Sequence, residues 1–237
     1  MSAVIDFHSH VLPGIDDGSR NVAESIAMLQ AEAAQGIDCV VATPHFYPQH
    51  DSPEHFLEKR AEAARQLRAE MAKYDGLPEL LLGAEVYFFP GIAQSDALSA
   101  LTIEGKTSIL IEMLPPPWSD AMYRELEEIQ TRRDLVPILA HVDRYIRPLR
   151  TYHIPQRLEE LPVLVQANAS FFLRRSTCSM AQKMLRKGQI HLLGSDCHNM
   201  TTRAPNLGQA IDQIRKHCGQ PYIERIASYQ EDALLDR

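Results

Sequence analysis

The sequence lacks any long apolar run. None of its 237 residues lies in an apolar stretch that approaches the ~20 residues needed to cross a bilayer. The amino terminus, MSAVIDFHSH, has neither the basic start nor the long apolar core of a signal peptide. We therefore expect a cytoplasmic protein that does not insert directly into a membrane.

Cysteine is scarce, and the four that occur are scattered along the chain at positions 39, 178, 197 and 218. No two of them form a C-x-x-C pair, so a thiolate zinc site has no ligand cluster. A chain of this length needs no disulfide framework, and a reducing compartment fits this cysteine usage.

The chain also lacks an excess of positive charge. Lysine and arginine number 24 against 31 acidic residues, a net charge of −7, which argues against a broad nucleic-acid-binding face. Neither a low-complexity linker nor a shift in composition divides the chain. Residues 1–237 are therefore expected to form a single domain, and 45% hydrophobic and 23% charged residues are typical of a soluble globular protein.

What the sequence does contain is an alternation of apolar runs and helical patterns. Runs that are apolar on both faces predict buried parallel strands, and they cover residues 3–7, 38–43, 79–88, 107–114, 135–142, 162–168 and 190–196. Helical patterns lie between or after them, at 21–36, 52–76, 119–134, 179–188, 206–219 and 222–236. The alternation predicts an α/β fold, a distorted (β/α)7 TIM-like barrel with seven strands rather than eight.

The stretch DFHSH at residues 6–10 places two histidines directly behind the first run. In an extended strand, side chains two residues apart point to the same side, so His8 and His10 can face one point. Taken alone, such a pair is explained as well by a hydrogen-bonded strand end. A metal or catalytic site would require imidazoles or carboxylates from other parts of the chain near the same point.

Six of the seven runs carry imidazoles or carboxylates near their ends. These residues are His8, His10, His45, Glu85, Glu112, His141, Asp196 and His198, and the loop after the first run adds Asp16 and Asp17. The carboxyl ends of barrel strands meet on one face, where the chemistry of such barrels takes place. The remaining histidines show no such placement and are expected at the surface or in packing, at positions 50, 55, 153, 191 and 217.

The carboxylates are the harder residues to explain as ordinary core. A lone histidine at a strand end is commonly a hydrogen-bonded core residue, but Glu85 and Glu112 lie in apolar runs, and an unpaired buried carboxylate costs several kcal/mol. A mixture of histidine and carboxylate ligands suits Mn²⁺, Zn²⁺ or iron. At about three protein ligands per catalytic ion, the set predicts two or three divalent metal ions, with Glu85 as a bridging ligand.

The motifs in order resemble the polymerase and histidinol phosphatase (PHP) superfamily, and within it the bacterial metal-dependent tyrosine phosphatases of capsule and exopolysaccharide synthesis. The resemblance is carried by DFHSHVLPGIDDG, ATPHF, GAEVYF, LIEM, LAHVDRY and GSDCHNMTTR, and it runs from residue 4 to about residue 215. It implies a PHP-type distorted barrel with a trinuclear site, usually assigned manganese.

The ligand pattern of the family falls on His8, His10, Asp17, His45, Glu85, Glu112, His141, Asp196 and His198. Asp17 fits the family's Asp-Gly step better than Asp16, which stays an alternative. The resemblance also implies that Arg144 and Arg203 bind phosphate. Its implied partner is a phosphotyrosine-containing protein, a membrane-anchored bacterial tyrosine kinase whose dephosphorylation would control polysaccharide synthesis.

The expected activity is that of a phosphoric monoester hydrolase acting on phosphotyrosine. A metal-bridged water, acidified toward a pKa of about 7, would supply the hydroxide that attacks phosphorus. Two alternatives keep the metal ions: hydrolysis of a small phosphomonoester such as histidinol phosphate, and a non-catalytic metal-binding or kinase-docking module. A third alternative rests on the C-x5-R pattern from Cys197 to Arg203, the signature of cysteine-based tyrosine phosphatases, but its loop has no glycine. We therefore expect Cys197 to be a packing residue.

Overall fold

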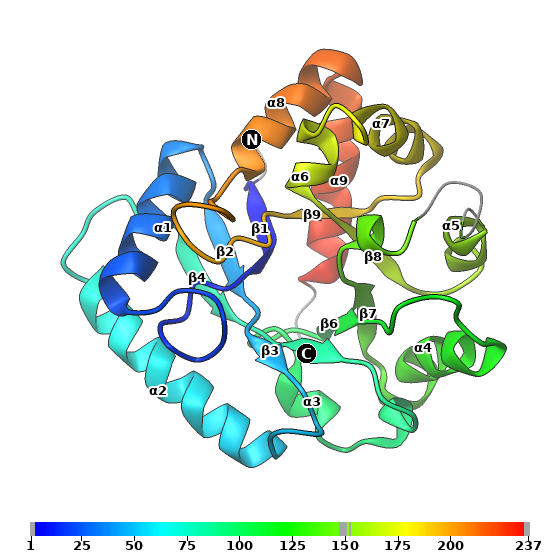
Figure 1. Ribbon diagram of the computed structural model, residues 1–237, viewed down its shortest axis with the longest axis horizontal. Helices are drawn as coiled ribbons and strands as arrows, with labels where there is room; N and C mark the ends of the chain where they lie inside the picture. The colour runs from blue at the N-terminus through cyan, green and yellow to red at the C-terminus, as the bar shows by residue number, and fades with distance from the viewer. Residues whose placement is uncertain (1–2, 147–150, 152, 235–237) are drawn as a thin grey trace.

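Parallel strands form the centre of the fold, and helices surround them in chain order (Figure 1). The computed structural model describes residues 3–146, 151 and 153–234. Its strands are β1 (Ile5–Ser9), β2 (Cys39–Ala42), β3 (His45–Phe46), β4 (Glu79–Leu82), β5 (Glu85–Tyr87), β6 (Ser108–Glu112), β7 (Val136–Leu139), β8 (Leu164–Asn168) and β9 (Leu192–Gly194).

These strands follow the seven predicted runs around one ring. One sheet has the order β1-β2-β4 and the other has the order β3-β5-β6-β7-β8-β9. The chain passes from the first sheet to the second twice, between β2 and β3 and between β4 and β5. A parallel bridge between Ser9 and Cys197 returns the segment after β9 to β1. The predicted α/β fold with a distorted seven-stranded barrel is confirmed.

One predicted strand is broken in the middle, and another is followed by a short strand that was not predicted. The run at 79–88 forms β4 and β5, and the run at 38–43 is followed by the separate strand β3. Pro44 has no N–H to donate to a ladder, and the N–H of His45 donates to the Asp16 carboxylate at 3.1 Å instead of to a strand. The break therefore lies where the chain must turn His45 and Glu85 toward the end of the barrel.

Polar side chains cap the first turns of the long helices α1 and α2. The Asn21 side chain accepts the N–H of Glu24 and Ser52 accepts that of His55, which satisfies free donors in each first turn. The helices are α1 (Val22–Ala34), α2 (Pro53–Met71), α3 (Leu98–Leu101), α4 (Asp120–Arg133), α5 (Ile154–Leu158), α6 (Ala169–Leu173), α7 (Cys178–Lys187), α8 (Leu207–His217) and α9 (Gln220–Ala233). The short helices α3, α5 and α6 were not predicted, and α2 ends five residues before its predicted end, at Met71.

The last helix, α9, closes one end of the barrel. Ser108, at the start of β6, donates to the carbonyl of Ala233 at 2.5 Å, and Gln230 donates to the carbonyl of Ile5 at 3.4 Å. Ala233 also joins the apolar cluster inside the barrel, with Ile5, Phe7, Cys39, Val41, Ile103, Leu110, Ile138, Ala140 and Leu192. The amino ends of β1 and β6 are thus covered by α9.

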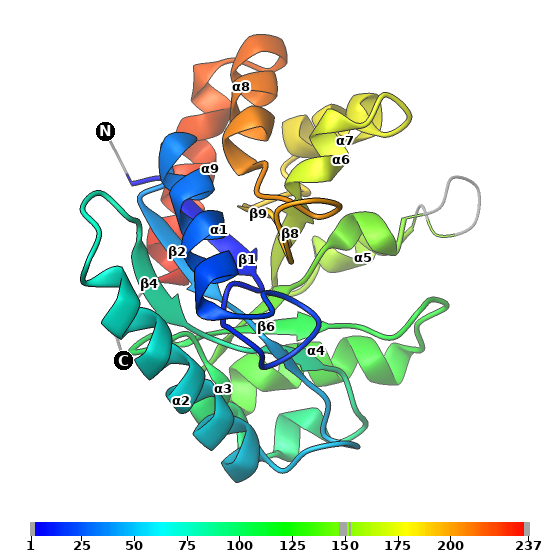
Figure 2. The ribbon, with the colours of Figure 1, turned by 60° about the vertical axis from the view of Figure 1, so that its left-hand side comes forward.

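The loops after β1 and β9 lie next to each other at the opposite end of the barrel. They are dark blue and orange in the two ribbon views (Figures 1 and 2), and the N–H of His10 donates to the carbonyl of Cys197 at 2.9 Å. Within the described residues, no helix combines the length and the apolar character that a bilayer crossing requires.

Candidate metal centre

The nine predicted metal ligands lie together at the carboxyl ends of the strands. Potential ligand atoms fall within 4.8 Å of one another in three overlapping groups: His10, Asp17, His45 and His198; His8, His10 and Glu85; and His45, Glu85 and Glu112. His141 joins through Glu85, with Nε2 2.7 Å from Oε1. Asp196 joins through His8 and His10, at 3.7 and 3.6 Å. The predicted convergence is present in the structure.

Glu85 is at the centre of this cluster. Its Oε2 lies 3.1 Å from His8 Nε2 and 3.4 Å from His10 Nε2. The same oxygen lies 3.0 Å from His45 Nδ1, while Oε1 contacts His141. Its side chain is only 1% exposed. A carboxylate that meets four imidazoles from the ends of three strands, β1, β3 and β7, has the position that a bridging ligand requires.

The two aspartates of the GIDDG loop have different partners. Asp17 Oδ1 lies 3.4 Å from both His45 Nε2 and His198 Nε2, so it faces the cluster. Asp16 Oδ2 instead contacts His10 Nδ1 at 2.7 Å and accepts the N–H of His45. The geometry favours Asp17 as the ligand and places Asp16 behind His10.

Gln166 is a residue of the site that the sequence did not indicate. It is fully buried in β8, and its Oε1 lies 3.3 Å from His8 Nδ1 and accepts the backbone N–H of His141 at 2.6 Å. A hydrogen bond at Nδ1 fixes the imidazole tautomer and leaves Nε2 as the free ligand atom. Gly194 leaves room for this contact, because a Cβ there would lie 2.5 Å from His8 Cβ and 2.8 Å from Gln166 Nε2.

Replacing Gln166 by leucine is expected to weaken Mn²⁺ binding by about 10–100-fold, the range for the loss of a partner that orients a ligand. The change keeps a similar volume but removes the acceptor for His8 and His141. Isothermal titration calorimetry measures the affinity. Gln66→Leu, on the exposed face of α2, is the matched control, and equal affinities in the two variants would contradict this role for Gln166.

Two candidate ligands have strained backbones. His141 has φ 31° and Asp196 has φ 54°, in the left-handed region that side-chain-bearing residues rarely adopt. The N–H of His141 is held by Gln166, and the N–H of Asp196 donates to the carbonyl of His8 at 2.8 Å. Such strain is concentrated at functional sites, where the surroundings impose it.

Histidine and carboxylate shift each other's pKa values across the cluster. Burial alone would raise the pKa of Glu85, but the neighbouring histidines, His8 first, hold it well below its ordinary range. Burial opposes the charged form of His10, yet the carboxylates of Asp16 and Glu85 raise its pKa to about 10. The buried carboxylates are thus stabilised by positive charge, which protonated histidines or bound divalent metal ions can supply.

Several buried polar atoms of the candidate ligands have no hydrogen-bond partner among the described residues. They lie at the carboxyl ends of the strands, which form the mouth of the barrel. His45 Nδ1 and Glu85 Oε2 are 3.0 Å apart, but neither has a hydrogen bond there. Native proteins rarely leave such atoms unsatisfied. The set comprises His45 Nδ1, Glu85 Oε2, Glu112 Oε2, His141 Nδ1 and His198 Nε2. Imidazoles and carboxylates together, without a thiolate, fit divalent cations such as Mn²⁺, Zn²⁺ or Fe²⁺.

Both predicted arginines adjoin the cluster through Asp196. Arg203 donates to Asp196 Oδ1 at 2.5 Å, and Arg144 donates to Oδ2. Arg144 Nη1 also lies 3.5 Å from Glu112 Oε1. Their side chains are 39% and 36% exposed for Arg144 and Arg203, and both line a cavity of about 420 Å³. The guanidinium groups therefore face solvent on one side and the cluster on the other.

The comparison with known proteins agrees with this geometry. The profile of the family described as capsular polysaccharide synthesis, CpsB/CapC, matches residues 4–236. This chain belongs to the CpsB/CapC family. The tyrosine-protein phosphatase YwqE of Bacillus subtilis (strain 168) is 28% identical over 232 residues, covering 93% of this chain and 88% of YwqE. The tyrosine-protein phosphatase CpsB of Streptococcus pneumoniae is 26% identical over 244 residues, covering 91% of each chain.

A solved structure extends this similarity to three dimensions. It comes from the crystal structures of YwqE from Bacillus subtilis and CpsB from Streptococcus pneumoniae, described there as unique metal-dependent tyrosine phosphatases. It matches this chain with a TM-score of 0.82 and 26% identity, over 97% of this chain and 92% of the other. The resemblance predicted from the motifs is confirmed.

The cysteine of the C-x5-R pattern is turned away from the mouth. Cys197 is fully buried, and its thiol donates to Glu32 Oε1 at 3.8 Å. Burial raises its pKa well above the ordinary value. A nucleophilic cysteine needs a lowered pKa and access to substrate, so this thiol is unsuited to attack phosphorus.

Replacing Cys197 by serine is therefore expected to change kcat by less than about threefold, which corresponds to under ~0.7 kcal/mol. Serine keeps a donor for Glu32, whereas a cysteine nucleophile would be lost. Turnover is measured per metal-loaded protein on a phosphotyrosine peptide. Complete loss of turnover with the metal content unchanged would support the cysteine mechanism instead.

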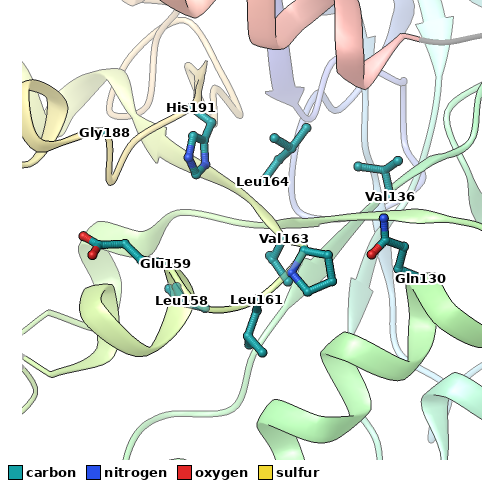
Figure 3. Close-up of a pocket in the computed structure, with 10 residues that line it drawn as sticks. Gln130, Val136, Leu158, Glu159, Leu161, Val163, Leu164, Gly188 and His191 are labelled. Atoms are coloured by element: carbon teal, nitrogen blue, oxygen red, sulfur yellow. The ribbon is translucent and has the colours of Figure 1, made fainter.

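The other five histidines are outside the cluster. His50, His55, His153 and His217 are exposed, and His50 lines a pocket beside the mouth. His191 accepts the N–H of Val165 at 2.8 Å and packs edge-on against Tyr229. It lines a cavity of about 360 Å³ at the amino ends of β7 and β8 (Figure 3), whose lining residues include none of the candidate ligands. These placements agree with surface and packing roles.

Proposed function

We propose that this protein is a metal-dependent protein-tyrosine phosphatase. The observation that carries the proposal is that candidate metal ligands and two arginines lie side by side at the mouth of the barrel. A carboxylate, Glu85, meets four imidazoles there, and a second carboxylate, Asp196, connects that cluster to two half-exposed arginines. Ligands for metal ions beside donors for phosphate are the parts that a phosphomonoesterase needs. The similarity to YwqE and CpsB supports the same activity.

In this proposal the centre takes two to three divalent ions, with manganese as the first choice and zinc or iron as alternatives. The proposed ligands are His8, His10, Asp17, His45, Glu85, Glu112, His141, Asp196 and His198. Bound there, the ions would lower the pKa of a water molecule and neutralise charge on the phosphoryl oxygens. Asp16 and Gln166 orient His10 and His8 from behind.

Arg144 and Arg203 are proposed to bind the phosphoryl group. A guanidinium presents two parallel donors that match two phosphate oxygens. Both groups contact Asp196, which holds them at the edge of the metal centre. In a transition state with charge spread over the phosphoryl oxygens, fixed donors of this kind contribute substantially to rate.

The surroundings of the mouth favour an aryl phosphate over an alkyl phosphate. Tyr47 stacks on His45 with ring centroids 5.2 Å apart and contacts Tyr87 at 5.3 Å. Tyr47 also lines a pocket of about 340 Å³ that adjoins Asp17 and His45. Aromatic rings attract one another in such arrangements, and a phenol, with a pKa near 10, leaves more readily than an alcohol. Phosphotyrosine has an aromatic ring and a phenol leaving group, whereas histidinol phosphate has an aromatic imidazole but an alcohol leaving group.

The protein substrate proposed here is a membrane-anchored bacterial tyrosine kinase, and the process it would control is capsule or exopolysaccharide synthesis. The family description and the names of the relatives support this context. We further propose that residues 1–237 act as one phosphatase domain in the cytoplasm, with no nucleic-acid partner and no direct insertion into the membrane.

The decisive assay compares three substrates as a function of metal: a phosphotyrosine peptide, the matching phosphoserine peptide and histidinol phosphate. We expect EDTA to abolish hydrolysis, Mn²⁺ to restore it, and the phosphotyrosine peptide to have the highest kcat/KM. Full activity in excess EDTA would contradict the metal mechanism, and a preference for histidinol phosphate would contradict the proposed substrate. Bound metal without hydrolysis of any substrate would favour a non-catalytic binding module.

A further inference from the structure

Strand β1 contains an irregularity immediately before the first two candidate ligands. Asp6 pairs with Val40 of β2 and Ser9 pairs with Ala42, so β1 advances three residues where β2 advances two. This is a β-bulge, in which one extra residue leaves the ladder and the alternation of side chains changes phase. It occupies the DFHS segment, and Asp6 has no role in the proposed centre.

The bulge determines where the imidazoles point. Ile5 and Phe7 belong to the apolar cluster inside the barrel, so regular alternation would next turn Ser9 inward. Instead Ser9 donates to the carbonyl of Val41, while His8 and His10 reach Glu85. Without the extra residue, the histidines would face the wrong side of the strand.

Asp6 holds the bulge by accepting the backbone donors that it leaves free. Its Oδ1 accepts the N–H of His8 at 3.1 Å and the N–H of Ser195 at 2.9 Å. One oxygen thereby ties β1 to the segment after β9, directly before Asp196. Two strands that carry candidate ligands are thus fixed by the same carboxylate.

Behind Asp6 lies a second buried carboxyl group, Glu32 of α1. Both side chains are 0% exposed, and their potential ligand atoms, with Cys197 Sγ, lie within 4.8 Å of one another. Asp6 Oδ2 and Glu32 Oε2 have no hydrogen-bond partner among the described residues. Two adjacent carboxyls buried without a cation cannot both be ionised. A protonated Glu32 would instead donate its O–H to Asp6.

We propose that Glu32 is a positioning residue, which holds Asp6 against the β1 bulge and so aims His8 at the metal centre. The inference rests on the proposed function, because it takes His8 as a metal ligand. Burial, and then the charge of Asp6, raise the pKa of Glu32 to about 10, in agreement with a neutral donor. An alternative, in which Asp6, Glu32 and Cys197 bind a cation of their own, requires Glu32 to be ionised.

The test measures Mn²⁺ affinity and stoichiometry by titration calorimetry and elemental analysis in Glu32→Met, Glu32→Gln and wild type. Methionine has a similar length but no donor, so we expect Mn²⁺ binding to weaken by about 10–100-fold. Glutamine supplies an N–H donor to Asp6, so we expect affinity within about threefold of wild type and the same number of ions. Glu62→Met, on the exposed face of α2, is the matched control and should bind Mn²⁺ as wild type does.

Each outcome decides a different point. Unchanged affinity in Glu32→Met would overturn the positioning role, and loss of one metal equivalent in Glu32→Gln would favour the separate cation site and also overturn it. Should Glu32→Met fail to fold, Glu32→Asp replaces it, since it withdraws the carboxyl by one methylene and should also weaken Mn²⁺ binding. A wild-type protein that binds no Mn²⁺ would contradict the proposed function itself, and the inference with it.

Discussion

Replacing Glu85 by glutamine is expected to leave a folded protein whose kcat/KM on a phosphotyrosine peptide is lower by about 10³-fold or more. Glu85 contacts His8, His10, His45 and His141, so its loss affects four imidazoles of the centre at once. An amide keeps its shape but has one acceptor oxygen and no charge. Losing a bridging ligand removes several kcal/mol of transition-state stabilisation, and each ~1.4 kcal/mol is tenfold in rate.

The control for this variant is Glu79→Gln, an exposed glutamate at the start of the adjacent strand β4. It should retain wild-type activity and metal content. Circular dichroism establishes that both variants are folded, and elemental analysis counts their metal. A Glu85→Gln protein with normal activity and a full complement of ions would show that the cluster is not the catalytic centre.

Replacing Arg203 by alanine is expected to lower kcat by about 10²–10³-fold, the range for removal of one preorganised donor to a developing charge. Arg203 contacts Asp196, and its guanidinium faces the cavity beside the cluster. Because it is not itself a proposed ligand, the protein should still bind its ions. Lysine at this position keeps the charge but loses the paired donors, so an intermediate loss is expected.

Arg174→Ala is the matched control, since Arg174 is exposed and lines the same cavity. We expect less than about threefold change in kcat, because the side chain is outside the proposed phosphate contacts. Steady-state kinetics on a phosphotyrosine peptide, with metal content measured for each sample, separate the two arginines. Equal losses in both variants would indicate a diffuse electrostatic effect instead of a specific phosphate contact.

The sequence predicted the barrel and the convergence because both depend on residue type at a particular place. Apolar runs give the strands, and parallel strands bring their carboxyl ends to one edge. Glu85 and Glu112 stand out in apolar runs because burial makes an unpaired carboxylate costly. The exposed histidines were separable from the cluster for the same reason, since none of them ends a buried run.

Features that depend on register and on pairing across the chain were not predictable. The bulge in β1 is visible only when Asp6 and Ser9 are matched to their partners in β2. Gln166 contacts His8, 158 positions away, and Glu32 is proposed to act through Asp6, which lies on a different element. Pro44 indicates an interruption of the strand, because proline cannot donate to a ladder. It does not indicate that the N–H of the next residue, His45, donates to the Asp16 carboxylate. For the adjacent Asp16 and Asp17, the family's Asp-Gly step favoured Asp17 but left Asp16 as an alternative, and their contacts in the structure differ.

Anomalous diffraction at the manganese absorption edge, on crystals of the protein grown with Mn²⁺, tests the central claim most directly. We predict two or three anomalous peaks, each within coordination distance of the imidazoles and carboxylates around Glu85. Crystals that show no anomalous peak, or that show peaks only on other faces of the molecule, would contradict the account.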